Sequence, residues 1–389
     1  MLELLTNAEL YDPEPRGRRH LLVAGETIAW IGGERPALPA GLGVQERDLE
    51  GRWIIPGLID GHVHLTGGGG EAGPHTRVPP VALSRLTGGG VTTAIGVLGT
   101  DDLIRTPAEL VTVARGLVAE GLSAWCHTGG YHVPPATVTG SVRGDLVLID
   151  RVLGVGELAV SDHRSSQPTV DELLRVAGDA HVGGLMSGKA GILHLHVGDG
   201  ERGLAPVRDM LDRSELPAAM FQPTHVNRRK ALFDEALELA ERGCTIDITA
   251  FPVADGEDAW SAADALVRYL EAGLPAERVT VSSDGGGCLP VFDESGRVTS
   301  MDVGRPGAIG ETLEALLAAG QPLERVLPAF TSNVAALLRL PRKGRLAPGA
   351  DADIVVLSGD GRIADVMARG RWHVRDRQVV IRGTFEHRE

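Results

Sequence analysis

Eight short apolar or β-branched segments alternate with longer amphipathic segments through the middle of the chain. This alternation is typical of repeated βα units, whose strands run parallel. Eight such units favour a closed (β/α)8 barrel of the TIM type within an α/β fold. The expected strands are residues 54–59, 91–98, 123–126, 157–160, 192–197, 220–224, 245–249 and 279–282. The expected helices include residues 106–121, 169–180, 230–243 and 310–320.

The two ends of the chain have a different pattern. Residues 1–53 and 341–389 contain short strand-like segments separated by glycine and aspartate. We expect these ends to pair as one small β-sandwich domain, with residues 54–340 forming the barrel. The length of 389 residues fits one large domain with a smaller one.

Composition excludes several classes of partner. The net charge is −14 and no run of lysine or arginine forms a basic stripe, which argues against binding to nucleic acid or to an anionic membrane. The three cysteines lack Cys-x-x-Cys spacing, so neither a disulfide framework nor a thiolate zinc site is expected. The sequence shows no signal peptide and no run of 18 apolar residues. We therefore expect a cytoplasmic protein without a membrane span.

A His-x-His motif follows the first expected barrel strand, in the segment Asp60-Gly61-His62-Val63-His64. Residues two apart on an extended chain point to the same face, so His62 and His64 can reach one point in space. At the carboxyl end of a barrel strand, that point lies in the mouth where active sites of such barrels are found. Two imidazoles placed in this way predict a site for a divalent transition metal.

Three more expected strands end in possible metal ligands. The fifth strand ends in HLHVGD, which offers His194 or His196, and the sixth ends in PTHVN, which offers His225. Asp284 follows the eighth strand in VSSDGGG. Suitable side chains at four strand ends of one barrel strengthen the metal hypothesis.

These motifs resemble a known family. The segments PGLIDGHVHL and GRLAPGADADIVVL, together with the histidines and the aspartate described above, are similar to the amidohydrolase superfamily of metal-dependent hydrolases. Within it, the segments HLTGGGGEAGPHTR, GGYHVP, SDHRSS and PTHVNR resemble the isoaspartyl (β-aspartyl) dipeptidases. The resemblance extends over essentially the whole chain.

The resemblance implies a metallo-dipeptidase with two divalent ions, expected to be zinc, although manganese and cobalt also suit the ligands. It assigns His62, His64 and Asp284 to the more buried ion, and His196 and His225 to the second. It also implies a homo-oligomer. The residues that match substrate contacts of the family are Gly69, Glu71, Thr100, Tyr131, Arg164 and Arg228.

The charges of three of these residues suit a small dipeptide with a β-aspartyl bond. Such a substrate carries one ammonium and two carboxylates beside its scissile amide. Glu71 can pair with the ammonium, and the planar guanidinium groups of Arg164 and Arg228 suit carboxylates.

The chain departs from the family at the residue that bridges the two ions. That residue is usually a carboxylated lysine on the fourth strand, but no lysine lies between residues 1 and 188. Counting back from Ser161 places Glu157 at this position, in a segment one residue longer than the family pattern. Glutamate offers the same bidentate carboxylate on a shorter side chain, so the strand must approach the ions. The extra glycine-flanked residue predicts a β-bulge that brings Glu157 closer.

A second departure is Cys288, which occupies a substrate-contact position where the family tends to have serine. The expected reaction is attack on the amide by a metal-bridging hydroxide. Asp284 would accept the proton and pass it to the departing amine, while Tyr131 would donate a hydrogen bond to the oxyanion.

Two other hypotheses compete with β-aspartyl hydrolysis. One keeps the enzyme class but changes the substrate to a cyclic amide or an N-acyl amino acid, which the three charged residues disfavour. The other is a metal-poor scaffold that has lost catalysis, which predicts missing ligands. The histidines and the aspartate are all present, so the sequence favours an enzyme.

Overall fold

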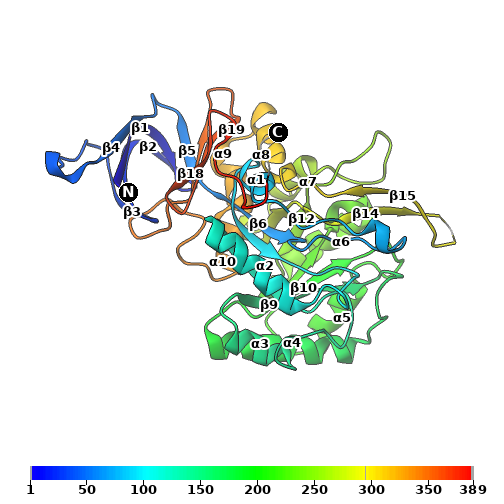
Figure 1. Cartoon of the computed structure of the whole chain (residues 1–389). Coiled ribbons are helices and arrows are strands. Elements are labelled where there is room, and N and C mark those ends of the chain that lie inside the picture. The colour runs from blue at the N-terminus through cyan, green and yellow to red at the C-terminus, as the bar shows by residue number, and fades with distance from the viewer. Residues whose placement is uncertain (1, 294, 387–389) are drawn as a thin grey trace.

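The computed structural model describes residues 2–293 and 295–386 (Figure 1). Six parallel strands form a sheet in the order β11-β10-β9-β8-β7-β6, and β12 and β13 form a parallel pair. β12 packs beside β11, and β13 packs beside β6, where a parallel bridge joins Val63 to Gly285. The strands are β6 (Leu58–Val63), β7 (Val91–Gly96), β8 (Ser123–Thr128), β9 (Val152–Val160), β10 (Ile192–Val197), β11 (Phe221–Thr224), β12 (Ile246–Thr249) and β13 (Val279–Ser282). The alternation of parallel strands and helices gives a TIM-like α/β fold.

Several expected strands differ from the structure by one or two residues at an end, and two differ by more. Residues 54–59 fall on two different strands, because β5 (Trp53–Pro56) pairs with strands of the chain termini and β6 begins at Leu58. The expected strand joins the apolar residues on the two sides of Pro56-Gly57, although this Pro-Gly pair is a turn signal that marks the break. The fourth strand begins at Val152 rather than Glu157, since its glycines weaken the strand pattern.

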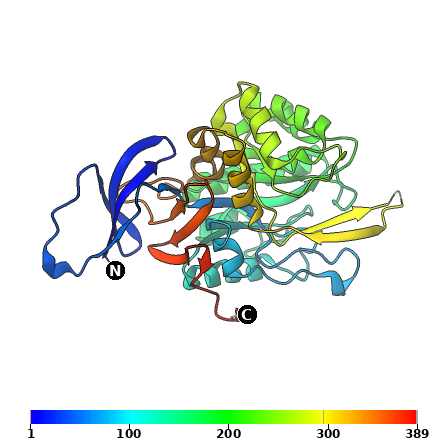
Figure 2. The ribbon, with the colours of Figure 1, turned by 90° about the horizontal axis from the view of Figure 1, so that it is seen from above.

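Strands from both ends of the chain form a nine-stranded sheet (Figures 1 and 2). Its path is β19-β18-β17-β16-β5-β1-β2-β3, and β4 pairs with β1. Figure 2 shows the C-terminal strands between the N-terminal strands and the TIM-like part. The additional strands are β1 (Leu2–Tyr11), β2 (Pro15–Ala24), β3 (Thr27–Gly32), β4 (Gln45–Asp48), β16 (Ile354–Leu357), β17 (Ile363–Ala368), β18 (Arg371–Arg375) and β19 (Gln378–Val379). Residues 1 and 387–389 of the expected terminal domain lie outside the described residues.

Helices follow most of the parallel strands, as the alternation predicts. Some of these helices begin with a side-chain cap: Thr106 accepts from the backbone N–H of Glu109, and Thr169 forms a capping box with Glu172. The helices are α1 (Leu83–Thr87), α2 (Pro107–Glu120), α3 (Val142–Leu148), α4 (Val170–Ser187), α5 (Ala205–Arg213), α6 (Lys230–Glu241), α7 (Ala262–Glu271), α8 (Ala308–Ala318), α9 (Leu323–Val326) and α10 (Ser332–Leu337).

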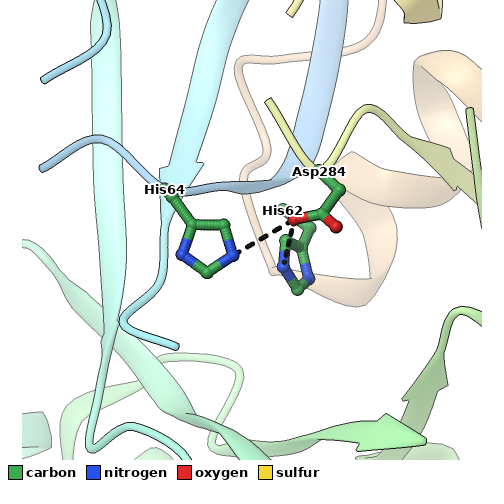
Figure 3. Close-up of side chains that lie close together, drawn as sticks. All are labelled: His62, His64 and Asp284. Carbon is green, nitrogen blue, oxygen red and sulfur yellow. Dashed lines mark ion pairs between the residues drawn. The ribbon is translucent and has the colours of Figure 1, made fainter. Parts of the chain in front are cut away.

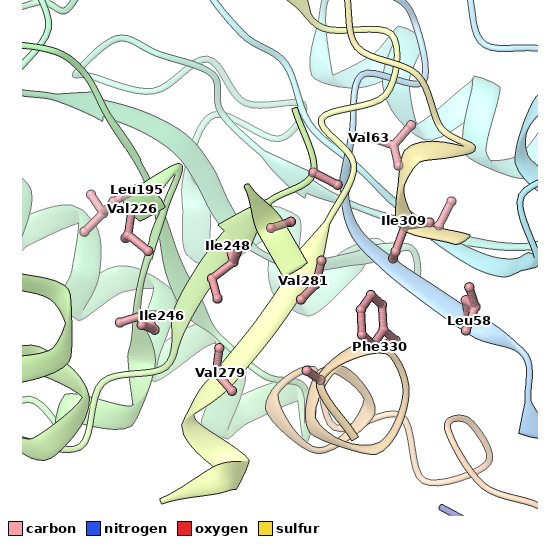
Figure 4. Packing of buried hydrophobic residues seen from close by; sticks show 14 of the residues in the cluster. Leu58, Val63, Leu195, Val226, Ile246, Ile248, Val279, Val281, Ile309 and Phe330 are labelled. Carbon is pink, nitrogen blue, oxygen red and sulfur yellow. The ribbon is translucent and has the colours of Figure 1, made fainter. Parts of the chain in front are cut away.

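Apolar packing fixes the strands from both sides. In one part of the main core, residues of β12 and β13 pack near Phe330 and Ile309 (Figure 4). A separate cluster joins Ile59, Leu153 and Ile192 to Val334 of α10. The three strand residues lie near the amino ends of their strands, so α10 packs at the end opposite the predicted metal ligands.

Beyond β13 the chain forms an antiparallel hairpin of β14 (Cys288–Phe292) and β15 (Val298–Val303), which projects from the TIM-like part (Figure 1). Among the helices of the described residues, none combines the length and apolar character needed to cross a membrane.

Candidate active site

The predicted metal ligands meet at the carboxyl ends of the parallel strands. His62 lies in β6 and His64 follows that strand, while Asp284 follows β13. Oδ1 of Asp284 lies 3.4 Å from Nε2 of His62 and 3.1 Å from Nε2 of His64 (Figure 3). The backbone of Asp284 is left-handed, with φ of 53°, a conformation that is uncommon outside glycine. These three residues can hold one ion.

Glu157 reaches the same ligands from β9. Its Oε1 lies 3.6 Å from Nε2 of His62 and 3.3 Å from Nε2 of His64. Its Oε2 faces the opposite side, 3.0 Å from Nδ1 of His196 and 3.4 Å from Nε2 of His225. The carboxylate therefore lies between the two pairs of histidines, which is the arrangement required of a bridging ligand.

A bulge in β9 places this carboxylate. Val155 pairs with Leu193 and Leu158 with Leu195, so β9 has one more residue than β10 in this interval. This register shift confirms the β-bulge predicted from the sequence. At Gly156, φ is 147° and a Cβ atom would lie 2.4 Å from the carbonyl oxygen of His194, so only glycine fits before Glu157.

The second group of possible metal ligands consists of His62, Glu157 and His225. His225 has a left-handed backbone with φ of 63°, and its Nδ1 lies 2.8 Å from the hydroxyl of Thr249. His196 faces Glu157 through Nδ1. The structure thus brings all six predicted ligands together.

The carboxylates and imidazoles of the cluster shift one another's pKa values. Burial alone would raise the pKa of Glu157, but His62 and His196 hold it well below its usual range. Burial disfavours the charged form of His64, yet Asp284 and Glu157 raise the pKa of His64 to about 9. Burial lowers the pKa of His225 to about 3. The two carboxylates therefore remain anionic at neutral pH and attract positive charge.

Several polar atoms of the cluster are buried without a hydrogen-bond partner among the residues that the structure describes. They are Nε2 of His62, Oε1 of Glu157 and Oδ1 of Asp284, and they face one another. Leaving a buried polar atom unpaired costs about 1–3 kcal/mol, and three such atoms that converge on one point indicate a ligand site. Imidazole nitrogens and carboxylate oxygens are the donors that divalent transition metals prefer. The residues present therefore fit a divalent metal site.

Glu71 and Arg164 lie beside this cluster. Oε1 of Glu71 accepts a hydrogen bond of 2.6 Å from the hydroxyl of Thr100 and lies 3.6 Å from a guanidinium nitrogen of Arg164. Oε2 of Glu71 is buried and has no partner within the described part of the chain. A Cβ atom at Gly99, the neighbour of Thr100, would lie 2.9 Å from the ring of His64. The carboxylate of Glu71 therefore lies close to the predicted metal ligands.

Tyr131 also borders the ligands. Its hydroxyl lies 2.8 Å from Nδ1 of His196, and the guanidinium of Arg164 lies 5.4 Å from the centre of its ring. Burial raises the pKa of Tyr131 well above its usual value, so the hydroxyl stays protonated and can donate.

The other predicted substrate contacts lie around the same mouth. Nη1 of Arg228 donates to the carbonyl of Val197, which follows His196 in the chain. Gly69, with φ of 79°, pairs with Arg77 through an isolated bridge. Burial and the nearby Glu71 raise the pKa of the Cys288 thiol to about 12, which keeps it protonated.

Sequence reasoning missed Asp162. Its carboxylate accepts three hydrogen bonds from Arg164, at 2.7, 3.0 and 2.7 Å, and lies 3.0 Å from Nε2 of His196. Burial alone would raise the pKa of Asp162, but His196 and Arg164 hold this pKa well below its usual range. The residue therefore joins a predicted metal ligand, His196, to a predicted substrate contact, Arg164. Its position in the segment SDHRSS, which carries part of the family resemblance, was the only signal.

Residue patterns left open whether His194 or His196 lies among the ligands, and the structure places the two histidines differently. His196 faces Glu157, whereas Nε2 of His194 lies 2.8 Å from Nδ1 of His62, behind the ligand cluster.

Comparison with known proteins agrees with this geometry. The amidohydrolase family model matches residues 194–373. A crystal structure of β-aspartyl dipeptidase from Fervidobacterium islandicum AW-1, in complex with a β-Asp-Leu dipeptide, is 41% identical, covers 97% of this chain and 98% of its own, and superposes with a TM-score of 0.90.

More distant proteins share the fold. D-hydantoinase from Thermus sp. is 18% identical, covers 98% of this chain and 97% of its own, and has a TM-score of 0.67. Imidazolonepropionase from Anaeromyxobacter sp. (strain K) is 27% identical over 369 residues, which are 86% of this chain and 82% of that protein. Because the 41% identity extends over nearly all of both chains, the protein belongs to the β-aspartyl dipeptidases of the amidohydrolase family.

Proposed function

We propose that the protein hydrolyses the β-aspartyl peptide bond of dipeptides at a site for two divalent metal ions, with zinc the expected ion. The observation that carries this proposal is the Glu71 carboxylate beside the predicted metal ligands: its Oε2 is buried and unpaired among the described residues, and its Oε1 lies 3.6 Å from a guanidinium nitrogen of Arg164. A buried carboxylate oxygen without a partner suits an ammonium, and a guanidinium suits a carboxylate. A β-aspartyl dipeptide carries both groups close to its scissile amide.

His62, His64 and Asp284 would hold one ion, and His196 and His225 the other, with Glu157 shared between them. Divalent ions in such a site activate water at neutral pH and polarise the amide carbonyl. Their ligands are supplied by strands that the surrounding core holds in fixed register.

The surrounding side chains would transfer the proton, stabilise the oxyanion and orient the substrate. Asp284 would accept a proton on its carboxylate and return it to the departing amine. Tyr131, kept protonated by burial, would donate a hydrogen bond to the developing oxyanion. Arg164 and Arg228 would orient the two carboxylates of the substrate, with Arg164 held in place by Asp162.

Substrate discrimination tests this proposal. We expect β-Asp-Leu to be hydrolysed with a kcat/KM at least about 100-fold higher than those of α-Asp-Leu and N-acetyl-β-Asp-Leu. Neither of the two poor substrates can place a free ammonium beside Glu71 in the same way. Equal activity on the acetylated dipeptide would overturn the assignment. A cyclic amide and an N-acyl amino acid complete the panel, and preference for either would favour the alternative substrate class.

We also propose the finer architecture expected from the sequence. Residues 54–340 would form a closed (β/α)8 barrel and the two ends a small β-sandwich domain, in a homo-oligomeric cytoplasmic enzyme. The adjacency of β13 to β6 supports closure of the barrel. The sheet that both ends share supports one terminal domain; it is a single sheet, and it includes residues 54–56 in β5. Light scattering after size-exclusion chromatography tests the oligomer, and a single-chain mass would contradict it.

A further inference from the structure

Behind the metal ligands, a line of buried hydrogen bonds runs across the interior of the TIM-like part. Nδ1 of His62 lies 2.8 Å from Nε2 of His194, and Nδ1 of His194 lies 2.9 Å from Oε1 of Gln222. The amide nitrogen of Gln222 donates to the hydroxyl of Thr280 at 3.2 Å, and this hydroxyl donates to Asp247 at 2.6 Å. All five side chains are buried.

We propose that Asp247, Thr280, Gln222 and His194 form a positioning relay that fixes the tautomer of His62 and so prepares it to bind a metal. This inference rests on the proposed metal site and goes beyond it, because none of the four side chains is assigned to the metal or the substrate in the proposed function.

The direction of the relay follows from its far end. Besides Thr280, the hydroxyls of Thr224 and Ser282 donate to Asp247, at 2.7 and 2.6 Å. Three donors leave the carboxylate as the acceptor, so the hydrogen of Thr280 is committed to Asp247. The oxygen of Thr280 must then accept, and this requires the NH2 group of Gln222 to point toward it.

The orientation of Gln222 determines the state of both histidines. Its carbonyl oxygen faces His194, so Nδ1 of His194 carries the hydrogen and Nε2 is left to accept. Nδ1 of His62 must then carry a hydrogen, which leaves the lone pair of His62 on Nε2. That nitrogen is the buried, unpartnered atom that faces Asp284 and Glu157. A ligating histidine needs such a partner on its other nitrogen.

Strand register explains why these residues meet. The β10–β11 ladder places His194 opposite Gln222, and the β12–β13 ladder places Asp247 opposite Thr280. The relay therefore spans the two separately paired sheets, and its link across them is the hydrogen bond from Gln222 to Thr280.

Replacement of Gln222 by methionine tests the relay. Q222M removes the acceptor from His194 at nearly constant volume, which allows His194 to carry its hydrogen on Nε2 and to force the hydrogen of His62 onto the metal-facing nitrogen. We expect the affinity for zinc, measured by chelator competition, to fall about 10–100-fold. Q222E keeps an oxygen acceptor for His194, so we expect its affinity to remain within about threefold of the unmodified protein.

Thr93→Val is the matched control, because the Thr93 hydroxyl is buried in β7 without a partner among the described residues and the substitution preserves shape. We expect no change in zinc affinity for T93V. Equal affinities of Q222M and T93V would overturn the relay, as would equal losses in Q222M and Q222E. Failure of the unmodified protein to bind zinc would instead overturn the proposed function.

Nitrogen NMR of the ¹⁵N-histidine-labelled protein gives a readout that depends on neither activity nor the variants. We expect hydrogen on Nδ1 of both His62 and His194, as the relay requires. Hydrogen on Nε2 of His194 would contradict the relay even if Q222M failed to fold.

Discussion

Two buried charged clusters in this molecule differ in whether their polar atoms are paired. Near the junction of the terminal sheet and the TIM-like part, the ammonium of Lys343 lies 2.9 Å from Asp351 and also contacts Asp353 and Ser123. None of these four side chains has an unpartnered buried atom among the described residues. In the metal-ligand cluster, by contrast, atoms of His62, Glu157 and Asp284 face one another unpaired, as described above.

The cluster in which all polar atoms are paired serves stability, and the cluster with unpaired atoms serves ligand binding. A buried ion pair with every donor and acceptor satisfied can be held by the fold without a ligand. A cluster with convergent unpaired atoms is incomplete until a cation binds, and its cost must be offset by the rest of the fold. We therefore expect substitutions in the two clusters to have opposite consequences.

The largest expected effect is that of Glu157→Gln. The amide cannot supply the anionic bridge between two ions, so we expect kcat/KM on β-Asp-Leu to fall by more than about 10³-fold. Metal content by elemental analysis should fall below that of the unmodified protein, while the free energy of unfolding of the metal-free protein should change little. Activity within tenfold of normal would show that Glu157 only adjusts the charge of the site.

Lys343→Met should give the opposite pattern. It leaves the buried Asp353 without its cation, whereas the half-buried Asp351 keeps its ion pair with Arg342. We expect the free energy of unfolding to fall by about 3–5 kcal/mol. Urea denaturation measures this loss. The folded fraction should keep kcat/KM within about threefold, because Lys343 belongs to the other cluster. Loss of activity in Lys343→Met without loss of stability would show that the two clusters do not have separate roles.

Metal removal should affect only the incomplete cluster. A ligand at 100 times its dissociation constant stabilises the folded state by about 2.7 kcal/mol, so treatment with a chelator should lower the unfolding free energy by a similar amount. Lys343→Met should show the same chelator effect as the unmodified protein, and Glu157→Gln a smaller one. An identical effect in Glu157→Gln would place the metal elsewhere.

The smallest expected effect concerns pH and His373 of the terminal sheet. Burial, with a contribution from Arg371, lowers the pKa of His373 to about 4, against 6.5 for an ordinary histidine. The unfolded chain therefore binds more protons between pH 6.5 and 4, and stability is present above pH 6.5 and is lost as pH falls through this range. The loss attributable to His373 is roughly 2–3 kcal/mol.

Unfolding of His373→Leu at pH 7 and pH 4 checks this value. The variant should lose less stability than the unmodified protein over the same interval. Parallel losses in the two proteins would show that His373 does not titrate in this range.

The clustering of the candidate metal ligands was more predictable than some strand boundaries. His62 and His64 were recognisable because a spacing of two on a strand puts both side chains on one face, whatever the rest of the chain does. Glu157 was recognisable because the family pattern lacked its lysine and the local segment had one residue too many. The break between β5 and β6 was missed because the apolar residues on its two sides look alike, although the two strands belong to different sheets. The Pro56-Gly57 pair between them was the local signal that marks it.

The sequence alone determined the kinds of ligand, their order along the chain and the family, because these depend on residue chemistry and on local spacing. Only the tertiary structure decided that Asp162 joins His196 to Arg164, and that His194 faces His62 instead of Glu157. It also decided which nitrogen of His62 is free for a metal. These contacts depend on the register between strands far apart in sequence, which the core sets through packing and which no local pattern encodes.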